Sequence, residues 1–311
     1  MTEHFQEFNL LLILGPTASG KTKVGVEIAR ALNGEIISGD SRQVFRKMDI
    51  GTGKDLKEYV DVPYHLIDIV DPGYEFSVFE FQRRFSDVFT DIRARGKLPI
   101  LVGGTGLYLD AILRKYRIAE APRNDRLRKE LEPLALETLV DRLKAANPRL
   151  HNTTDLLDRE RVIRAMEIAE LREKGKEGFP LPDLEPIVFG IKWPRKVLRQ
   201  RITLRLKERM NQGMIEEVKG LLESGVSFQT LEFYGLEYRF VGQHLKGKLN
   251  RNDTFQKLKS AIHQFAKRQE TWFRRMERQG ILIHWVEGGK DPVAAALRIM
   301  RGIPNNDSSS C

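Results

Sequence analysis

The chain has 311 residues, 41% of them hydrophobic and 31% charged, which is the composition of a globular protein and not of a disordered or fibrous one. It contains no apolar run long enough to span a membrane, and its first residues, MTEHFQEF, lack the features of a secretory signal. We therefore expect a cytoplasmic protein with no membrane partner. The single cysteine, Cys311, excludes an internal disulfide and a cysteine-based zinc site.

Positive charge is concentrated in one part of the chain. Residues 191–280 contain 20 Lys and Arg against 9 Asp and Glu, whereas the whole chain has a net charge of +9. A basic segment of this size favours a polyanionic partner such as nucleic acid, because neutralised phosphates supply most non-specific affinity. A solvated helical surface is the alternative interpretation.

Short apolar runs alternate with helical patterns over the first 118 residues. The runs at residues 9–14, 35–38, 64–70 and 98–102 have the length of buried parallel strands. A helix follows the first run, and another is predicted to begin at Ser77, where Glu80 completes a capping box. This alternation predicts an α/β fold with an open parallel sheet between two layers of helices, a three-layer α/β/α domain.

The pattern changes near residue 115. Residues 124–172 are charged and helical with no strand candidate, and residues 172–186 form a Gly- and Pro-containing linker. We therefore expect an all-helical domain at 119–186, inserted into a core domain that comprises 1–118 and 187–304. The second part of the core begins with a strand at 187–193, continues with basic helices and ends with a strand at 281–286 and an amphipathic helix. Residues 305–311 are predicted to be a disordered tail.

A phosphate-binding loop follows the first predicted strand. The sequence GPTASGKT, residues 15–22, fits the pattern G-x-x-x-x-G-K-[ST] between a strand and a helix, as in ATP-binding and other nucleotide-binding proteins. Lys21 supplies a charge to the phosphates, and the Thr22 hydroxyl is placed to ligate Mg²⁺. The residues predicted to bind a diphosphate are Gly15, Thr17, Ala18, Ser19, Gly20, Lys21 and Thr22. The motif leaves the reaction open, because the diphosphate can be attacked at phosphorus or can leave when carbon is attacked.

Two further strand ends bring polar groups to the same edge of the predicted sheet. Asp40 follows the second strand and Thr105 follows the fourth, within the sequence LVGGTGLY. Asp40 can hold Mg²⁺ through water or accept a proton from a nucleophile, and its position alone is compatible with both roles.

In these stretches together, the chain resembles the tRNA dimethylallyltransferase family, in its compact bacterial form. The matching pieces lie between residues 15 and 274 and include GPTASGKT, DSRQVF, HLIDIVDP, LVGGTGLY, RVIRAMEI, RITLRLKERMNQGMIEEV and AKRQETWFR. The resemblance implies transfer of a dimethylallyl group from dimethylallyl diphosphate to the exocyclic amine of the adenosine next to the tRNA anticodon, with release of diphosphate. It implies Mg²⁺ as cofactor and the tRNA anticodon stem-loop as partner, and we expect a monomer.

The resemblance also implies roles for individual residues. Asp40 matches the general base, Thr105 a threonine beside the reacting centre, and Lys21 a group that stabilises the leaving diphosphate. The tRNA contacts that the resemblance and the basic helices together predict are Asp40, Ser41, Arg42, Gln43, Arg128, Arg161, Arg164, Arg201, Arg205, Lys267, Arg268, Gln269 and Arg274.

The basic helices also allow structural interpretations. Arg201, Arg205 and Arg209 recur on one helical face and could instead pair with the carboxylates of residues 208, 216 and 217. In the helix expected from residue 254, Gln269 falls within an apolar stripe, where its side chain needs a hydrogen-bond partner. For residues 272 and 273, core packing is favoured over base stacking.

Three other functions remain as alternatives. An adenylate isopentenyltransferase acting on a free nucleotide would need less positive charge over 191–280. A P-loop kinase or ATPase would not be expected to contain the sequence DSRQV, and a nucleic-acid-binding protein without activity would not need to keep Lys21, Thr22 and Asp40. The sequence EFYGLEYRF at 232–240 departs from the shorter segment usual in the family, so the resemblance implies no RNA contacts for it.

Overall fold

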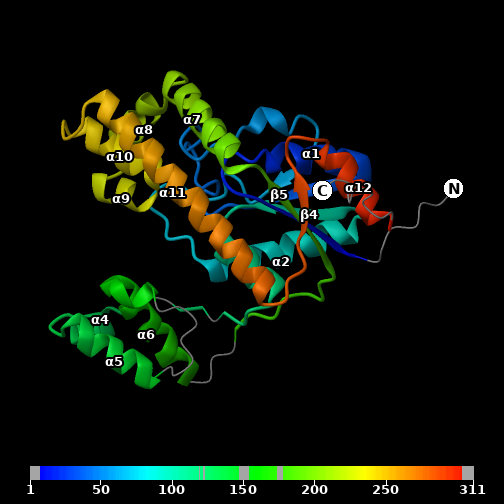
Figure 1. Cartoon of the computed structure of the whole chain (residues 1–311). Coiled ribbons are helices and arrows are strands. Elements are labelled where there is room, and N and C mark those ends of the chain that lie inside the picture. Colours follow the sequence, from blue (N-terminus) through cyan, green and yellow to red (C-terminus); the bar gives the residue numbers. More distant parts are fainter. Residues whose placement is uncertain (1–7, 119, 122, 147–153, 174–177, 303–311) are drawn as a thin grey trace.

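The computed structural model describes residues 8–118, 120–121, 123–146, 154–173 and 178–302 (Figure 1). The expected tail at 305–311 lies outside these ranges. The described strands are β1 (Leu10–Leu14), β2 (Gly34–Gly39), β3 (Tyr64–His65), β4 (Leu98–Gly103), β5 (Pro186–Lys192) and β6 (His284–Glu287). They form one parallel sheet in the order β3-β2-β4-β1-β5-β6, which confirms the predicted fold class.

Helices connect these strands and extend beyond them. The α-helices in the same ranges are α1 (Lys21–Leu32), α2 (Val78–Ala94), α3 (Gly106–Leu113), α4 (Asp125–Leu131), α5 (Leu136–Ala146), α6 (Arg159–Glu173), α7 (Arg195–Asn211), α8 (Met214–Glu223), α9 (Phe228–Phe233), α10 (Leu236–Leu245), α11 (Arg251–Arg278) and α12 (Pro292–Met300). Two short 3₁₀ helices, η1 (Leu56–Glu58) and η2 (Thr154–Leu157), complete the elements. None of the helices in the described part is long and apolar enough to cross a bilayer.

The central strand β1 explains the three layers. All five of its residues are apolar and buried, and alternate side chains of a strand point to opposite faces of the sheet. Leu11 and Ile13 pack in one cluster with α1 and α12, while Leu10, Leu12 and Leu14 pack in another with α2, α3 and α11. Both faces of the sheet are therefore covered by helices.

A third apolar cluster joins the helices α7 to α11 to the loop that follows β2. Ile202 and Leu206 of α7 and Ile262 of α11 pack there against Val44 and Phe45. This packing fixes the basic helices beside the loop that begins at the carboxyl end of β2, and it positions them for contacts with the phosphate-binding loop.

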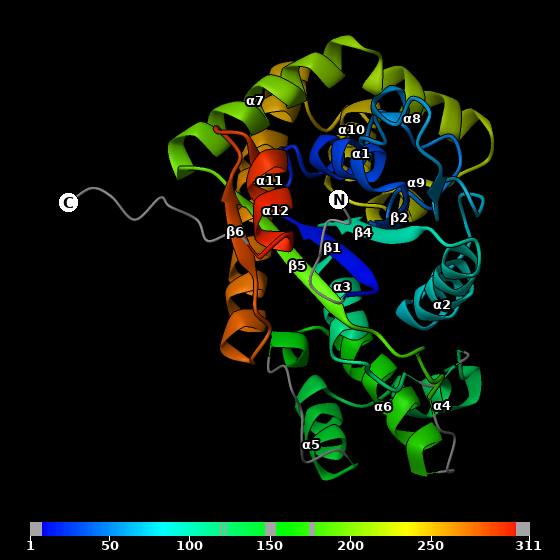
Figure 2. The same ribbon diagram turned by 90° about the vertical axis from the view of Figure 1, so that its right-hand side faces the viewer.

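The helices α4, α5 and α6 lie in the segment that was expected to be inserted. They share a small apolar cluster of their own, which includes Leu131, Leu139 and Val162. Figures 1 and 2 show them set apart from the sheet and its covering helices, on the side below α9 and the end of α11. The domain boundaries themselves stay a prediction.

One predicted strand is wrong for most of its length. Residues 64–70 were expected to form a strand, but β3 ends at His65. Leu66 and Asp68 have positive φ values of 62° and 55°, which break the extended conformation. The apolar residues after His65 are buried because this loop folds against residues 43–46, with Ile69 N–H donating to the Val44 carbonyl.

Other element limits differ less. The helix expected at Ser77 is confirmed, since the Ser77 side chain accepts a hydrogen bond from the Glu80 N–H and caps α2. Helix α11 begins at Arg251 and not at residue 254, because Asn250 caps it through the Asp253 N–H. Strand β6 covers His284–Glu287, shifted toward the C-terminus from the predicted 281–286.

Candidate active site

A cavity of about 610 Å³ lies at the carboxyl ends of β1, β2 and β4. Its walls include Thr17, Lys21 and Thr22 of the phosphate-binding loop, residues 40–43 after β2 and residues 103–108 after β4. Helices α7, α10 and α11 contribute further side chains, and Arg161 of α6 brings the segment of inserted helices to the same cavity. Open parallel sheets bind ligands at this edge, so the cavity is the candidate active site.

The phosphate-binding loop presents the N-terminus of α1 to this cavity. The loop turns through Ala18, which has a φ of 62°, and through Gly20, which caps the helix with a φ of 86°, a conformation that favours glycine. Helix α1 then begins at Lys21, so unpaired backbone N–H groups and the positive end of the helix dipole face an incoming anion. The seven residues predicted to bind a diphosphate all belong to this loop and helix start.

Three cations gather around the loop. Burial, and then the charge of Arg205, lower the pKa of Lys21 to about 8. Burial and the charge of Arg209 likewise lower the pKa of Arg205, whose guanidinium remains charged at neutral pH and donates to the Thr17 hydroxyl. Arg209 is itself buried and lies 3.5 Å from the Asp55 carboxylate. Lys21, Arg205 and Arg209 repel one another at the wall of the cavity, and a bound diphosphate would relieve this repulsion.

The depressed pKa of Lys21 predicts a pH dependence of diphosphate binding. Below about pH 8 the Lys21 ammonium is charged and attracts the anion, and above it the neutral amine does not. We expect the affinity for dimethylallyl diphosphate to stay roughly constant between about pH 7 and 8, where the terminal phosphate of the ligand is already ionised, and to fall by up to about tenfold per pH unit above pH 8. Calorimetric titration without RNA measures this. Lys21→Met should remove the inflection, and an unchanged inflection in that variant would assign it to another group.

Asp40 and Thr105 lie together, as predicted. Asp40 Oδ1 accepts a hydrogen bond of 2.8 Å from the Arg42 N–H, which fixes the turn after β2. Thr105 Oγ1 accepts one of 3.1 Å from the Ser41 N–H and so ties the end of β2 to the end of β4. All four side chains line the cavity, with Asp40 next to the phosphate-binding loop. Their roles in catalysis and in RNA contact stay predictions.

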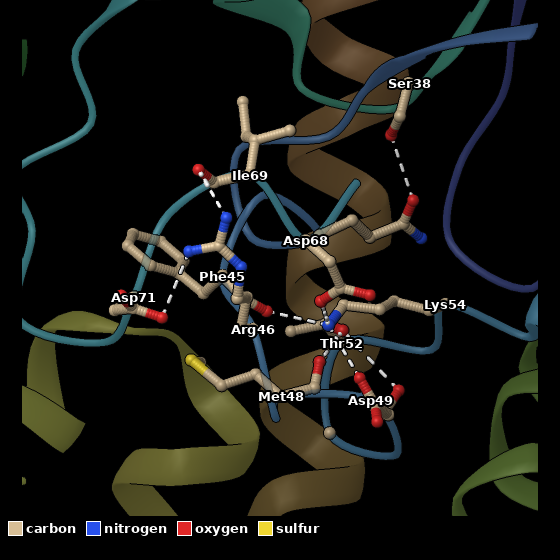
Figure 3. Close-up of polar contacts among 12 residues, drawn as sticks. Ser38, Phe45, Arg46, Met48, Asp49, Thr52, Lys54, Asp68, Ile69 and Asp71 are labelled. Carbon is tan, nitrogen blue, oxygen red and sulfur yellow. Dashed lines mark hydrogen bonds and ion pairs between the residues drawn. The ribbon is translucent and has the colours of Figure 1, made fainter. Parts of the chain in front are cut away.

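The loop from Gln43 to Asp55 is held by buried polar contacts. Gln43 accepts a bond of 2.9 Å from the Ser38 hydroxyl and donates one of 3.1 Å to the Gly53 carbonyl. Figure 3 shows the fully buried Lys54 donating to the Phe45 carbonyl at 2.7 Å and to the carboxylates of Asp49 and Asp68. Gln43 thus uses its amide within the protein, and the network holds Asp55 beside Arg209.

Gln269 of α11 bridges two walls of the cavity. Its Oε1 accepts a bond of 2.8 Å from the Thr17 N–H, and its Nε2 donates one of 2.8 Å to the Gly104 carbonyl. A Cβ at residue 104 would lie 2.5 Å from that Nε2, so the bridge depends on a glycine there. The expected need of Gln269 for a hydrogen-bond partner is confirmed.

Removing this bridge should loosen the phosphate-binding loop. Gln269→Leu leaves the Thr17 N–H and the Gly104 carbonyl unpaired, so we expect a loss of about 2–4 kcal/mol in the free energy of unfolding and weaker binding of dimethylallyl diphosphate. Denaturant unfolding and calorimetry measure the two effects. Gln264→Leu, at an exposed position of the same helix, is the control. Equal stability and affinity in Gln269→Leu and the wild type would show that the bridge contributes nothing.

The rest of α11 carries exposed cations and a buried face. Lys267, Arg268 and Arg274 are exposed, and of these only Arg268 borders the cavity. Phe273 is fully buried, which confirms core packing for this residue. Trp272 packs against the apolar cluster that contains Phe273 and the residues of β1 facing α2, but it also lines the cavity.

The predicted RNA-contacting arginines of the inserted segment differ in their surroundings. Arg128 and Arg164 both bind the buried Glu167, at 2.7 and 2.8 Å. Burial alone would raise the pKa of Glu167, but the hydrogen bonds from Arg128 and Arg164 lower it to about 2. These two arginines hold the inserted helices together, whereas Arg161 lines the cavity. Contact of all three with RNA stays a prediction.

Arg201 and Arg205 reach the phosphate-binding loop and do not lie on an open helical surface. Arg201 donates to the Ala18 carbonyl at 2.9 Å, and its guanidinium lies 4.3 Å from the Trp193 ring centroid. The alternative interpretation, in which these arginines pair with residues 208, 216 and 217, does not hold for Glu217, whose carboxylate accepts hydrogen bonds from the backbone N–H groups of residues 49–51. The stripe of arginines is therefore part of the site.

Sequence reasoning missed several groups at the cavity. Arg209 was noted only as the end of a basic stripe, and Asp55, Glu237 and Tyr238 were not considered as site residues although they line the cavity. Burial raises the pKa of Glu237, against the opposing charges of Arg209 and Arg205. The spacing of Arg209 four residues after Arg205 was the one signal available.

Known proteins match the chain over nearly its whole length. The IPP transferase family model matches residues 43–276, and the isopentenyl transferase model matches residues 8–63. A tRNA dimethylallyltransferase 1 of Geotalea uraniireducens is 66% identical over 94% of this chain and 97% of its own, and a tRNA dimethylallyltransferase 2 of Syntrophotalea carbinolica is 65% identical over 94% and 98%. The tRNA isopentenylpyrophosphate transferase structure from Bacillus halodurans is 34% identical, with a TM-score of 0.70 over 95% of each chain. The fold is also shared by a eukaryotic dimethylallyltransferase whose structure was solved acting on tRNA. That protein is 22% identical to this chain, with a TM-score of 0.76 over 97% of this chain and 82% of its own.

Proposed function

The chain belongs to the IPP transferase family, and we propose on that premise that it transfers a dimethylallyl group from dimethylallyl diphosphate to the exocyclic amine of the adenosine next to a tRNA anticodon. Diphosphate is the second product. The observation that carries this proposal is that Asp40 and Thr105 lie in one cavity with Lys21 of the phosphate-binding loop and with two arginines of α7, Arg205 and Arg209.

The cavity contains the groups that this reaction needs. The amine nitrogen forms a bond to the allylic carbon, and the bond between that carbon and the diphosphate oxygen breaks. Asp40 accepts the proton that the amine loses, a role that contributes about 10²–10⁴-fold in enzymes generally. Lys21, Arg205 and the N-terminus of α1 stabilise the negative charge that develops on the leaving diphosphate.

The cavity also fits Mg²⁺. This ion prefers oxygen ligands and is usually bound through one or two protein oxygens together with substrate phosphates. Thr22 and Asp40 both line the cavity and supply oxygens of this kind. We propose that Thr22 ligates Mg²⁺, which would add charge stabilisation to the leaving diphosphate.

Two observations favour a tRNA over a free nucleotide or a phosphoryl acceptor. The cavity is bordered by Arg161 of the inserted helices and by Arg268 of α11, so positive charge from two separate helices lies at its edge. Exposed cations continue along α11 at Lys267 and Arg274. We propose the anticodon stem-loop as the part of the tRNA that binds, and a monomer working in the cytoplasm as the active form.

One assay tests the proposed function. Purified protein is incubated with radiolabelled dimethylallyl diphosphate and Mg²⁺, with unmodified tRNA or free AMP as acceptor. Label should enter tRNA and not AMP, and ATP should not be hydrolysed at a comparable rate. Preferential labelling of AMP would favour the free-nucleotide enzyme, and tRNA-independent release of phosphate from ATP would favour a kinase or ATPase.

A further inference from the structure

Two exposed phenylalanines at the edge of the cavity each lie beside an arginine. Phe233, the last residue of α9, is 64% exposed, and the Arg42 guanidinium lies 5.3 Å from its ring centroid. Phe265 of α11 is 38% exposed, with the Arg268 guanidinium 5.8 Å from its centroid. Arg42, Phe265 and Arg268 line the cavity, and Phe233 directly precedes Tyr234, which lines it as well.

The packing of the core does not require either ring. Tyr234 is 2% exposed and its ring centroid lies 4.6 Å from that of Phe45, so it anchors the end of α9. On α11, the buried residues Ile262 and Ala266 next to Phe265 supply the contacts with the apolar cluster. Single exposed apolar residues are common, but these two rings lie on separate helices, each beside an arginine that lines the same cavity.

An aromatic ring beside a guanidinium is suited to an unpaired nucleobase. Sequence-specific recognition of single-stranded RNA loops stacks splayed bases on aromatic side chains and on arginine planes. Phe233 lies within the segment 232–240, and Phe265 lies on the helix that carries Lys267, Arg268 and Arg274. Positive charge is thus available for the phosphates on either side of a stacked base.

We propose that Phe233 and Phe265 are stacking platforms for the RNA bases that flank the reacting adenosine, one base for each ring. This inference rests on the proposed function and deepens it, because it names how the neighbours of the target nucleotide are bound. It also gives the atypical segment 232–240 a contact with RNA.

The test uses the full chain and a synthetic anticodon stem-loop RNA. Phe233→Ala and Phe265→Ala should each weaken RNA binding about 5- to 150-fold, which is the range for one lost base stack. Phe233→Trp and Phe265→Trp should bind as the wild type does. The salt slope of RNA binding should stay unchanged in both alanine variants, because no charge is removed. The affinity of Phe233→Ala for dimethylallyl diphosphate should also stay unchanged, because Phe233 does not itself line the cavity. Phe255→Ala is the control for loss of an aromatic ring beside a cation away from the cavity: Phe255 lies on α11 with Phe265, 5.7 Å from the Lys259 ammonium, and does not border the cavity. Phe255 also packs against the apolar cluster, so the stability of this variant is measured alongside its RNA binding.

RNAs with an abasic nucleotide directly before or after the reacting adenosine assign each ring to a base. The penalty of each alanine variant should disappear on the RNA that lacks its base and persist on the other. Alanine variants that bind normal RNA like the wild type, or penalties that both abasic RNAs leave unchanged, would overturn the inference. A wild type that binds the RNA but prenylates none would instead refute the proposed function.

Discussion

Asp40→Asn is expected to lower kcat for prenyl transfer by about two to four orders of magnitude, the range for a removed general base. The amide cannot accept the proton from the attacking amine at neutral pH. It can still accept the hydrogen bond from the Arg42 N–H through its oxygen, so the turn after β2 should keep its shape. Single-turnover prenyl transfer, together with binding of dimethylallyl diphosphate and of tRNA, measures this separation of chemistry from binding.

Two comparisons make this result specific. Asp40→Ala removes the hydrogen bond as well as the base, so unlike Asp40→Asn it should also weaken RNA binding. Asp55 is another acidic residue of the cavity, and its carboxylate lies 3.5 Å from Arg209. Asp55→Asn removes the partner charge of Arg209, so it should change diphosphate binding more than the rate of the chemical step. If Asp40→Asn lost affinity for Mg²⁺ or diphosphate and kept its single-turnover rate, Asp40 would be a metal-site residue and not the base.

Local signals made the sheet and the phosphate site predictable. The apolar runs that became β1, β2, β4 and β5 are short and continuous, which is the pattern of strands buried on both faces. The phosphate-binding loop and the Ser77 cap depend on residues only a few positions apart, so their geometry follows from the sequence alone.

The error at residues 64–70 has a cause that no local pattern contains. Leu66, Ile67 and Val70 are buried, and their apolar run looks like a strand. Asp68 must instead turn toward Lys54, which lies fourteen positions earlier in the chain and is itself fully buried (Figure 3). The ion pair between Lys54 and Asp68 thus prevails over the strand preference of the local apolar pattern.

The gathering of positive charge at the diphosphate site also could not be predicted from the sequence. The spacing of Arg201, Arg205 and Arg209 predicted one helical face, but it could not show that this face packs against the phosphate-binding loop. That contact depends on the apolar cluster that joins α7 and α11 to the loop after β2. The row of arginines on α7, which in the sequence looks like a nucleic-acid-binding surface, therefore supplies positive charge to the diphosphate site.

Lys21→Met is expected to lower kcat by about 10²–10³-fold and to weaken binding of dimethylallyl diphosphate, because it removes a positive charge from the wall of the cavity that holds the leaving group. Stability should not fall with activity. Lys21 is repelled by Arg205 and disfavoured by burial, so an uncharged side chain of similar length removes an unfavourable interaction from the protein without ligand. Prenyl transfer, calorimetry and thermal unfolding of the same preparation measure the three effects.

Lys23→Met is the matched control, since Lys23 lies two positions further on the same helix, with a side chain 72% exposed and an ion pair to Glu27. A surface pair of this kind contributes little, so this variant should retain activity and stability close to the wild type. If Lys21→Met kept its rate, stabilisation of the leaving diphosphate would not depend on Lys21. If Lys21→Met lost stability instead, Lys21 would be paired in the protein, and the depressed pKa that predicts the inflection near pH 8 would be wrong. The inflection and the stability of this one variant therefore test the same repulsion in two independent ways.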